Sequence, residues 1–182
     1  MLRRDLEQVL GDVDRHCDGD IDRLLNDEHE RIALYVSALA TVTAEREREL
    51  VALVLRDPDH PAARSAVCYH IDTRAPQLRT TSAITAWAAT LADLVAHDSF
   101  LCRRIEDWRL FADVVKGRPV ALHALSAATP WMQRKLAEEA SSLSVLAVLA
   151  ETGLTKKIRN IAGHRANRVR RTAGRPATHE VQ

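Results

Sequence analysis

Apolar residues recur every three or four positions along nearly the whole chain, and this spacing constrains the fold more than any other feature. Two stripes are clearest: Ile84, Trp87, Ala88, Leu91, Leu94 and Val95, then Leu101, Ile105, Trp108, Phe111 and Val115. Such spacing places apolar side chains on one face of an α-helix, whereas a strand needs alternation, and no segment alternates convincingly. The sequence therefore predicts an all-α fold.

The residues that start and stop helices mark eleven candidate segments, of which we expect about nine or ten to form helices, with one or two of the short segments left out. We expect helices near 2–15, 20–26, 29–41, 44–56, 61–73, 82–96, 99–116, 119–127, 130–140, 144–152 and 155–170. Pro61 and Pro130 suit first-turn positions. The candidate N-caps are Thr43, Ser99, Thr129 and Thr155, and Gly117 and Gly153 suit the left-handed conformation after a helix end.

Length and composition fit one globular domain. The chain has 182 residues, of which 46% are hydrophobic and 28% charged, and we expect a single helical domain over 1–171 with a flexible tail over 172–182. No apolar run is long enough to span a bilayer and the first residues lack a signal peptide, which predicts a cytoplasmic protein. The three cysteines, Cys17, Cys68 and Cys102, show no paired spacing, so we expect reduced thiols.

Short connections between helices predict antiparallel hairpins, which either stack into a solenoid or close into a bundle. From Leu55 to Val67, an acid (Asp57) ends one helix, a proline turn follows, and Arg64 with small apolar neighbours opens the next. This resembles the inter-helix signature of HEAT repeats, a family in which the Asp and Arg form a ladder along the stack. The resemblance implies a short α-solenoid of antiparallel hairpins; the alternative is an irregular helical bundle.

A second internal similarity lies near the end of the chain. The segment 131–137 is echoed by 156–162, with the apolar segment 144–151 between them. This order resembles a leucine-rich-repeat variant or a HEAT-like unit. Together the two resemblances cover residues 29–73 and 130–166. For the core, we expect these residues to be mostly buried: Trp87, Leu91, Leu94, Ile105, Phe111, Leu136, Val145, Leu149, Ile158 and Ile161.

Residues that could carry chemistry are scattered. Asp18, Asp20 and Asp22 begin like an EF-hand loop, but Arg23 and His29 occupy its sixth and twelfth positions, so a capped polar turn is favoured. The side chains of His16, Cys17, Cys68, His70 and Cys102 could meet only through tertiary folding. For Cys68 and His70 we expect a buried thiol and a partly exposed imidazole. Without a nucleophile motif or a phosphate loop, we predict a non-enzymatic protein with no cofactor and no metal, and the alternative is an enzyme whose residues converge only in three dimensions.

One enzymatic alternative comes from another resemblance. HEAT-like DNA glycosylases use tryptophans and an Asp on a concave face, and Trp108 and Asp113 invite that comparison. Positions five apart lie about 140° apart around a helix. We therefore expect Trp108 to face the core with Phe111 and Val115, and Asp113 to face solvent.

The C-terminal segment is strongly basic. Residues 154–182 carry eight Lys or Arg against one acidic residue, although the whole chain has a net charge of only +1. The candidate binding residues are Lys156, Lys157, Arg159, Arg165, Arg168, Arg170 and Arg171. Lys157, His164, Arg168 and Arg171 fall together on one side of the expected helix.

Such a helix can contact phosphates, an acidic protein groove or an anionic membrane surface, or can simply be a solvated last helix beside an acidic body. The leading hypothesis is a scaffold that presents a helical repeat surface to another protein. The alternative is a nucleic-acid-binding protein that uses the basic C-terminal helix, with a relative of the HEAT-like glycosylases as its enzymatic variant.

Overall fold

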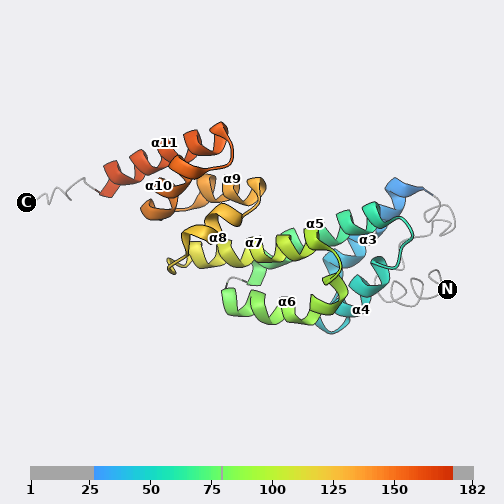
Figure 1. Cartoon of the computed structure of the whole chain (residues 1–182). Coiled ribbons are helices and arrows are strands. Elements are labelled where there is room, and N and C mark those ends of the chain that lie inside the picture. Colours follow the sequence, from blue (N-terminus) through green and yellow to red (C-terminus); the bar gives the residue numbers. More distant parts are fainter. Residues whose placement is uncertain (1–26, 79, 174–182) are drawn as a thin grey trace, which may run out of the picture. The chain divides into compact units, whose positions relative to one another are not determined.

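The structure is a computed structural model that describes residues 27–78 and 80–173. In this part of the chain every regular element is a helix and no strand occurs, which confirms the all-α prediction (Figure 1). The helices are α3 (Glu28–Thr41), α4 (Ala44–Val54), α5 (His60–Leu78), α6 (Thr81–Val95), α7 (Ser99–Val115), α8 (Leu122–Ala127), α9 (Pro130–Glu139), α10 (Leu143–Thr152) and α11 (Lys156–Ala173). The helices expected over 2–15 and 20–26, and Asp18, Asp20 and Asp22, lie outside the described residues.

The chain divides into two compact units, 1–106 and 107–182, with the boundary inside α7. Unit 1 contains α3 to α6 and the first half of α7, and unit 2 contains the rest. The expectation of a single domain over 1–171 stays a prediction. Thr172 belongs to α11 rather than to the expected tail, and residues 174–182 lie outside the described part.

Hydrogen bonds at helix N-termini confirm two of the expected caps. The hydroxyl of Thr129 accepts from the backbone N–H of Met132 at 3.2 Å, and that of Thr155 accepts from Ile158 in the same way. Ser99 is not a cap, because Asp98 precedes it and accepts from the first backbone N–H groups of α7. Thr43 occupies the N-cap position of α4 without a side-chain hydrogen bond to the backbone. Local sequence therefore places most helix starts correctly.

The two glycines expected to end helices behave differently. Gly117 has φ of 67° after α7, which is the left-handed conformation that was predicted. Gly153 has φ of −54°, so that prediction is wrong. A Cβ at Gly153 would lie 2.5 Å from the carbonyl oxygen of Leu149 and 2.8 Å from Cγ2 of Ile158. Glycine is needed there because the backbone packs too closely for a side chain.

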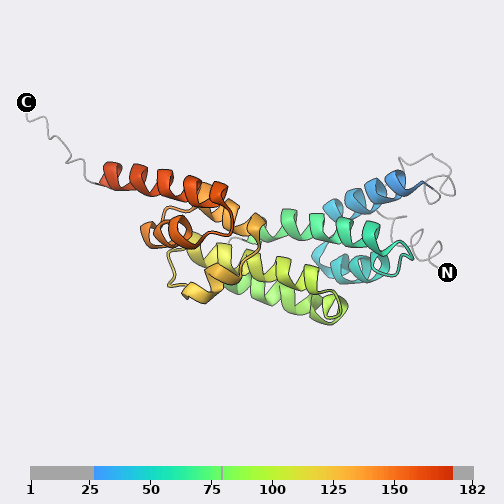
Figure 2. The same cartoon turned by 45° about the horizontal axis from the view of Figure 1, so that its top comes forward.

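In unit 1, α3 packs against α5 and α4 against α6, and contacts also join α3 to α4, α4 to α5 and α5 to α6 (Figures 1 and 2). Two Arg–Asp hydrogen bonds join α3 to the start of α5 and α5 to the start of α7. Arg31 of α3 bonds Asp59 at 3.0 Å, and Arg64 of α5 bonds Asp98 at 2.6 Å. Asp59 and Asp98 also accept backbone N–H groups at the starts of α5 and α7. The same side-chain arrangement therefore occurs twice in this unit.

The acid of the HEAT-like segment, Asp57, is buried among side chains of α3. It accepts a hydrogen bond from the hydroxyl of Tyr35 and lies 3.1 Å from Nε of Arg31. Burial of the Tyr35 hydroxyl, together with this hydrogen bond to Asp57, raises its pKa well above the usual value. Asp57 thus fastens the turn before α5 to α3.

In unit 2, α10 and α9 pack against α11, and α8 and α9 also contact α10 (Figures 1 and 2). The buried amide of Gln133 on α9 ties two connections to this core. Its nitrogen donates to the carbonyl of Leu125 at 2.9 Å, and its oxygen accepts from the backbone N–H of Leu154 at 2.9 Å. Because the amide both donates and accepts, α9 fixes the end of α8 and the turn before α11.

The cores consist mainly of alanine and branched aliphatic side chains. Of the ten residues expected in the core, seven are buried: Trp87, Leu91, Ile105, Leu136, Val145, Leu149 and Ile158. Leu94, Phe111 and Ile161 are half-buried. Val115 is exposed and Val114 is buried instead, so the expectation that Val115 faces the core is wrong. In the last turn of α7 the apolar side chain that enters the core is therefore Val114, one residue before the predicted Val115.

Candidate functional site

All seven predicted binding residues lie on α11, but they separate into two groups. Five are exposed: Lys156, Lys157, Arg168, Arg170 and Arg171. The other two, Arg159 and Arg165, are half-buried and bond to the backbone. The predicted site is therefore smaller than the basic segment that defined it.

Arg159 and Arg165 stabilise helix ends. Arg159 donates to the carbonyl of Gly153 at 2.6 Å, and Arg165 donates to the carbonyl of Ala140 at 2.9 Å. Gly153 and Ala140 are the residues that end α10 and α9. Carbonyls at a helix end lack intrahelical donors, and cations there also complement the helix dipole. These two arginines thus hold the helices against α11.

Three exposed cations and one histidine form a straight row, which we call the outer stripe: Lys157, His164, Arg168 and Arg171. At 100° per residue, these four lie within about 60° around the helix, and at 1.5 Å per residue they extend over about 21 Å. All four are exposed, and they lie away from the buried positions Ile158, Ala162 and Ala166. The row therefore faces solvent along most of α11.

No acidic residue balances this stripe locally. Residues 156–173 contain no Asp or Glu. In unit 2, Asp113, Glu138 and Glu139 pair with Arg118, Arg134 and Lys135, none of which is on α11. Within the described residues, no carboxylate comes within ion-pairing distance of a cation on α11. Among the residues that the structure describes, the positive charge of α11 therefore has no acidic partner.

The aromatic residues of unit 2 form a packed cluster. Trp108 is only 3% exposed and lies edge-on to Phe111 and Trp131, with ring centroids 5.4 and 5.7 Å apart. The ammonium of Lys135 lies 5.2 Å from the centroid of Trp108. Asp113, the other residue of the glycosylase comparison, forms an ion pair with Arg118 at 3.2 Å. Trp108 therefore offers no open face on which a base could stack.

Unit 1 contains a buried polar cluster that the sequence analysis missed. Oε1 of Glu47 lies 2.6 Å from Nε2 of His70 and accepts from the indole N–H of Trp87 at 2.8 Å. Arg74 is nearby, with Nε 3.8 Å from the same oxygen. Glu47 and His70 are 5% and 4% exposed, so the expectation of a partly exposed His70 is wrong. The imidazole is buried because it pairs with this carboxylate.

Hydrogen bonding decides the charge of this carboxylate. Burial opposes ionisation of Glu47, but the hydrogen bonds from His70 and Trp87, together with the nearby charges of His70 and Arg74, outweigh it and hold the pKa below its usual value. Glu47 falls on the apolar stripe of α4, three and four residues before Leu50 and Val51. A charged residue at such a position signals a buried polar partner, and that signal was available in the sequence.

A cavity of about 210 Å³ opens beside this cluster. Its lining residues come from the end of α3, from α4 and from α5: Leu39, Ala40, Val42, Ala44, Glu47, His70, Thr73, Arg74 and Gln77. Both donors of the cluster bind Oε1, and in the described part of the chain none reaches Oε2 of Glu47. The cavity thus places an acceptor and a guanidinium in a mostly polar lining.

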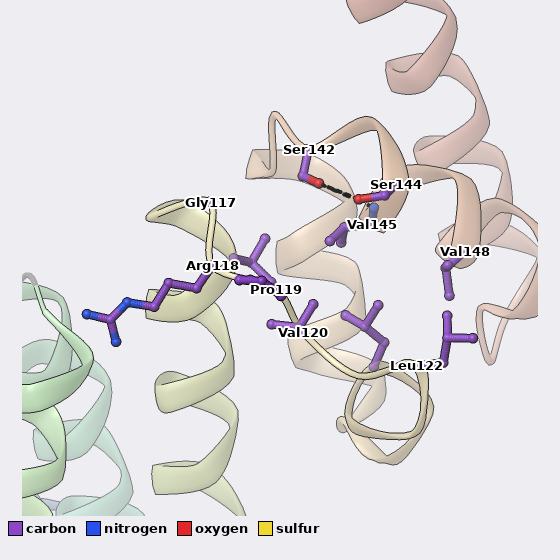
Figure 3. A pocket seen from close by; sticks show the side chains of 11 residues that line it. Gly117, Arg118, Pro119, Val120, Leu122, Ser142, Ser144, Val145 and Val148 are labelled. Carbon is purple, nitrogen blue, oxygen red and sulfur yellow. Dashed lines mark hydrogen bonds between the residues drawn. The ribbon is translucent and has the colours of Figure 1, made fainter.

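A larger cavity of about 320 Å³ lies within unit 2 (Figure 3). Val120, Leu122, Val145 and Val148 point into it, and the hydroxyls of Ser142 and Ser144 bond each other at its edge. The guanidinium of Arg118 points away and pairs with Asp113. This cavity offers both apolar contact and hydroxyl groups.

Cysteine and histidine residues do not assemble into a metal site in the described ranges. Cys68 is buried and Cys102 half-buried, and burial raises the pKa of the Cys68 thiol. No group of three His, Cys, Asp or Glu side chains within 27–78 and 80–173 is placed to hold a metal ion. His16 and Cys17 lie outside these ranges. Among the described helices, none has the length and apolar character required to cross a bilayer.

Comparison with protein-family models, with curated proteins and with solved structures finds no match to this chain. The HEAT-like resemblance therefore stays a prediction.

Proposed function

We propose that this is a non-enzymatic macromolecule-binding protein whose outer stripe on α11 contacts the phosphate backbone of nucleic acid. The observation that carries the proposal is the exposed row of Lys157, His164, Arg168 and Arg171 on a helix without acidic residues. Cations arranged in this way bind a polyanion by displacing its condensed counterions.

The composition of the exposed face favours nucleic acid over an acidic protein. Besides the cations, the exposed positions of α11 include Asn160 and Asn167, while its large apolar residues are buried or half-buried. Protein interfaces concentrate their binding energy in apolar and aromatic anchors, whereas protein–DNA interfaces are more polar and more positively charged. The face fits the second description better.

The test is a fluorescence anisotropy titration with single- and double-stranded oligonucleotides at three salt concentrations. Three permanent cations in the outer stripe give an expected log–log salt slope near −2.7 for duplex, at about 0.9 per phosphate. The double variant Arg168→Gln/Arg171→Gln should reduce the slope by about 1.8 and weaken binding to all sequences alike.

A matched control removes the same charge from the same helix. Lys156→Gln/Arg170→Gln changes two exposed cations that lie outside the outer stripe, so it should keep most of the affinity. Equal loss in both double variants would show that only the net charge matters. The proposal fails if wild-type protein does not bind at low salt and micromolar concentration. Tighter binding to poly-L-glutamate than to the oligonucleotides would indicate an acidic protein partner instead.

A protein partner is the second candidate, and exposed aromatics in unit 1 favour it. Tyr69 on α5 and Phe100 on α7 are 53% and 47% exposed, and aromatic residues are enriched at protein interfaces. Such a scaffold would use the stacked hairpins that the two Arg–Asp links suggest. Affinity capture from host extract should lose specific partners with Tyr69→Ser/Phe100→Ser. Retention of every partner would count against this candidate.

A further inference from the structure

The cavity beside Glu47 combines features that together specify a ligand. It belongs to unit 1, whereas the outer stripe on α11 belongs to unit 2. A ligand in this cavity is therefore a second binding activity besides the proposed function. At about 210 Å³ it is smaller than the roughly 300 Å³ at which pockets for drug-sized ligands begin. Only a small molecule fits.

The carboxylate of Glu47 can accept a hydrogen bond from a ligand in the cavity. Trp87 and His70 both bind Oε1, which fixes the orientation of the carboxylate. Oε2 receives no donor from the residues that the structure describes. This oxygen is not sealed from solvent, so water or a ligand in the cavity can donate to it. An ammonium group would satisfy it with a charge-assisted bond.

The guanidinium of Arg74 is half-buried and can bind an acceptor in the cavity. Its Nε is 3.8 Å from Oε1 of Glu47, and its Nη1 makes a 3.3 Å contact with the amide oxygen of Gln77. A guanidinium has five N–H donors in a planar fork, so these contacts leave N–H groups for a ligand. A carboxylate matches that fork with two parallel hydrogen bonds.

The remaining lining residues are Leu39, Ala40, Val42, Ala44, Thr73 and Gln77, and most of the surface that the cavity exposes is polar. We propose that the cavity binds a small zwitterion of the α-amino-acid class. Its ammonium contacts Oε2 of Glu47 and its carboxylate contacts Arg74. A lone anion would be repelled by Glu47, and a lone cation by Arg74, so only a ligand with both charges gains from both residues.

The test compares L-valine with its two halves by isothermal titration calorimetry on the full chain. Isobutylamine lacks the carboxylate of valine, and 3-methylbutanoate lacks the ammonium. Each half loses one charge-assisted interaction, so each should bind at least about tenfold more weakly than valine. If either analogue binds as tightly as valine, the assignment of both charges is wrong. If valine binding is undetectable, the proposed binding site is wrong.

Single-residue variants distinguish a loss of valine binding from a loss of folding. Arg74→Gln changes a side chain at the cavity rim and should weaken valine at least about tenfold, whereas the exposed Arg56→Gln in the same unit should leave affinity unchanged. Glu47→Gln should weaken valine as well, provided that circular dichroism shows native helix content. Wild-type affinity in Arg74→Gln would refute the proposal even if Glu47→Gln does not fold.

Discussion

Replacing Glu47 by Ala should destabilise unit 1 strongly because it leaves two buried donors without an acceptor. The indole N–H of Trp87 and Nε2 of His70 both bond Oε1 of Glu47, and both rings are buried. Each of the two buried donors left unpaired costs about 1–3 kcal/mol, so we expect a total loss of about 2–6 kcal/mol. Glu47→Gln keeps an oxygen that can accept both bonds but loses the charge, and should cost about 1–2 kcal/mol.

Urea unfolding followed by circular dichroism measures these differences, because helix content does not depend on the environment of one tryptophan. Glu49→Ala is the control: it removes an exposed carboxylate from the same helix and should change the unfolding free energy by less than about 0.5 kcal/mol. If Glu47→Ala is as stable as Glu49→Ala, or Gln costs as much as Ala, the buried hydrogen bonds do not hold this unit together.

Three further changes test the packing and the buried charges. Leu149→Ala should cost about 2–5 kcal/mol in chemical denaturation, because Leu149 is fully buried. Gly153→Ala should lower the free energy of unfolding by about 1–3 kcal/mol, because its Cβ meets a carbonyl oxygen. Gly163→Ala has room inside α11 and should raise the free energy of unfolding by about 0.5–1 kcal/mol. Equal effects of the two changes would refute the close approach at Gly153. Glu47 and Asp98 have folded pKa values below the usual 4.5 and 3.8, so their contribution to stability is complete above about pH 4.5 and declines as acid protonates them. A thermal midpoint that rises between pH 5 and pH 3 would contradict this sign.

The stripes and caps of the helices could be predicted because each depends on residues close in sequence. Pro130 and the cap at Thr129 mark the start of α9 without reference to any other helix. The C-terminal ends of helices were predicted less accurately than their starts. Helix α5 continues to Leu78, past the expected residue 73, with Pro76 in its last turn. Helix boundaries respond to tertiary packing as well as to local residues.

The candidate sites divide in the same way. The outer stripe was visible in the sequence, since the angular positions of Lys157, Arg168 and Arg171 follow from one helix alone. The roles of Arg159 and Arg165 were not, because the carbonyls that they cap belong to other helices. Sequence gives the charge of a residue but not the acceptor that it meets.

The sequence by itself determined that this chain is helical, where most of its helices begin, and which side of α11 carries unbalanced positive charge. These properties follow from the 3.6-residue period and from capping residues, both of which are local. Only the tertiary structure decided that Glu47 meets His70 and Trp87, which are 23 and 40 residues away along the chain. It also decided that Gly153 is needed for a close approach rather than for a left-handed turn. A buried polar group or a tight contact takes its partner from another helix, and no local period specifies that partner.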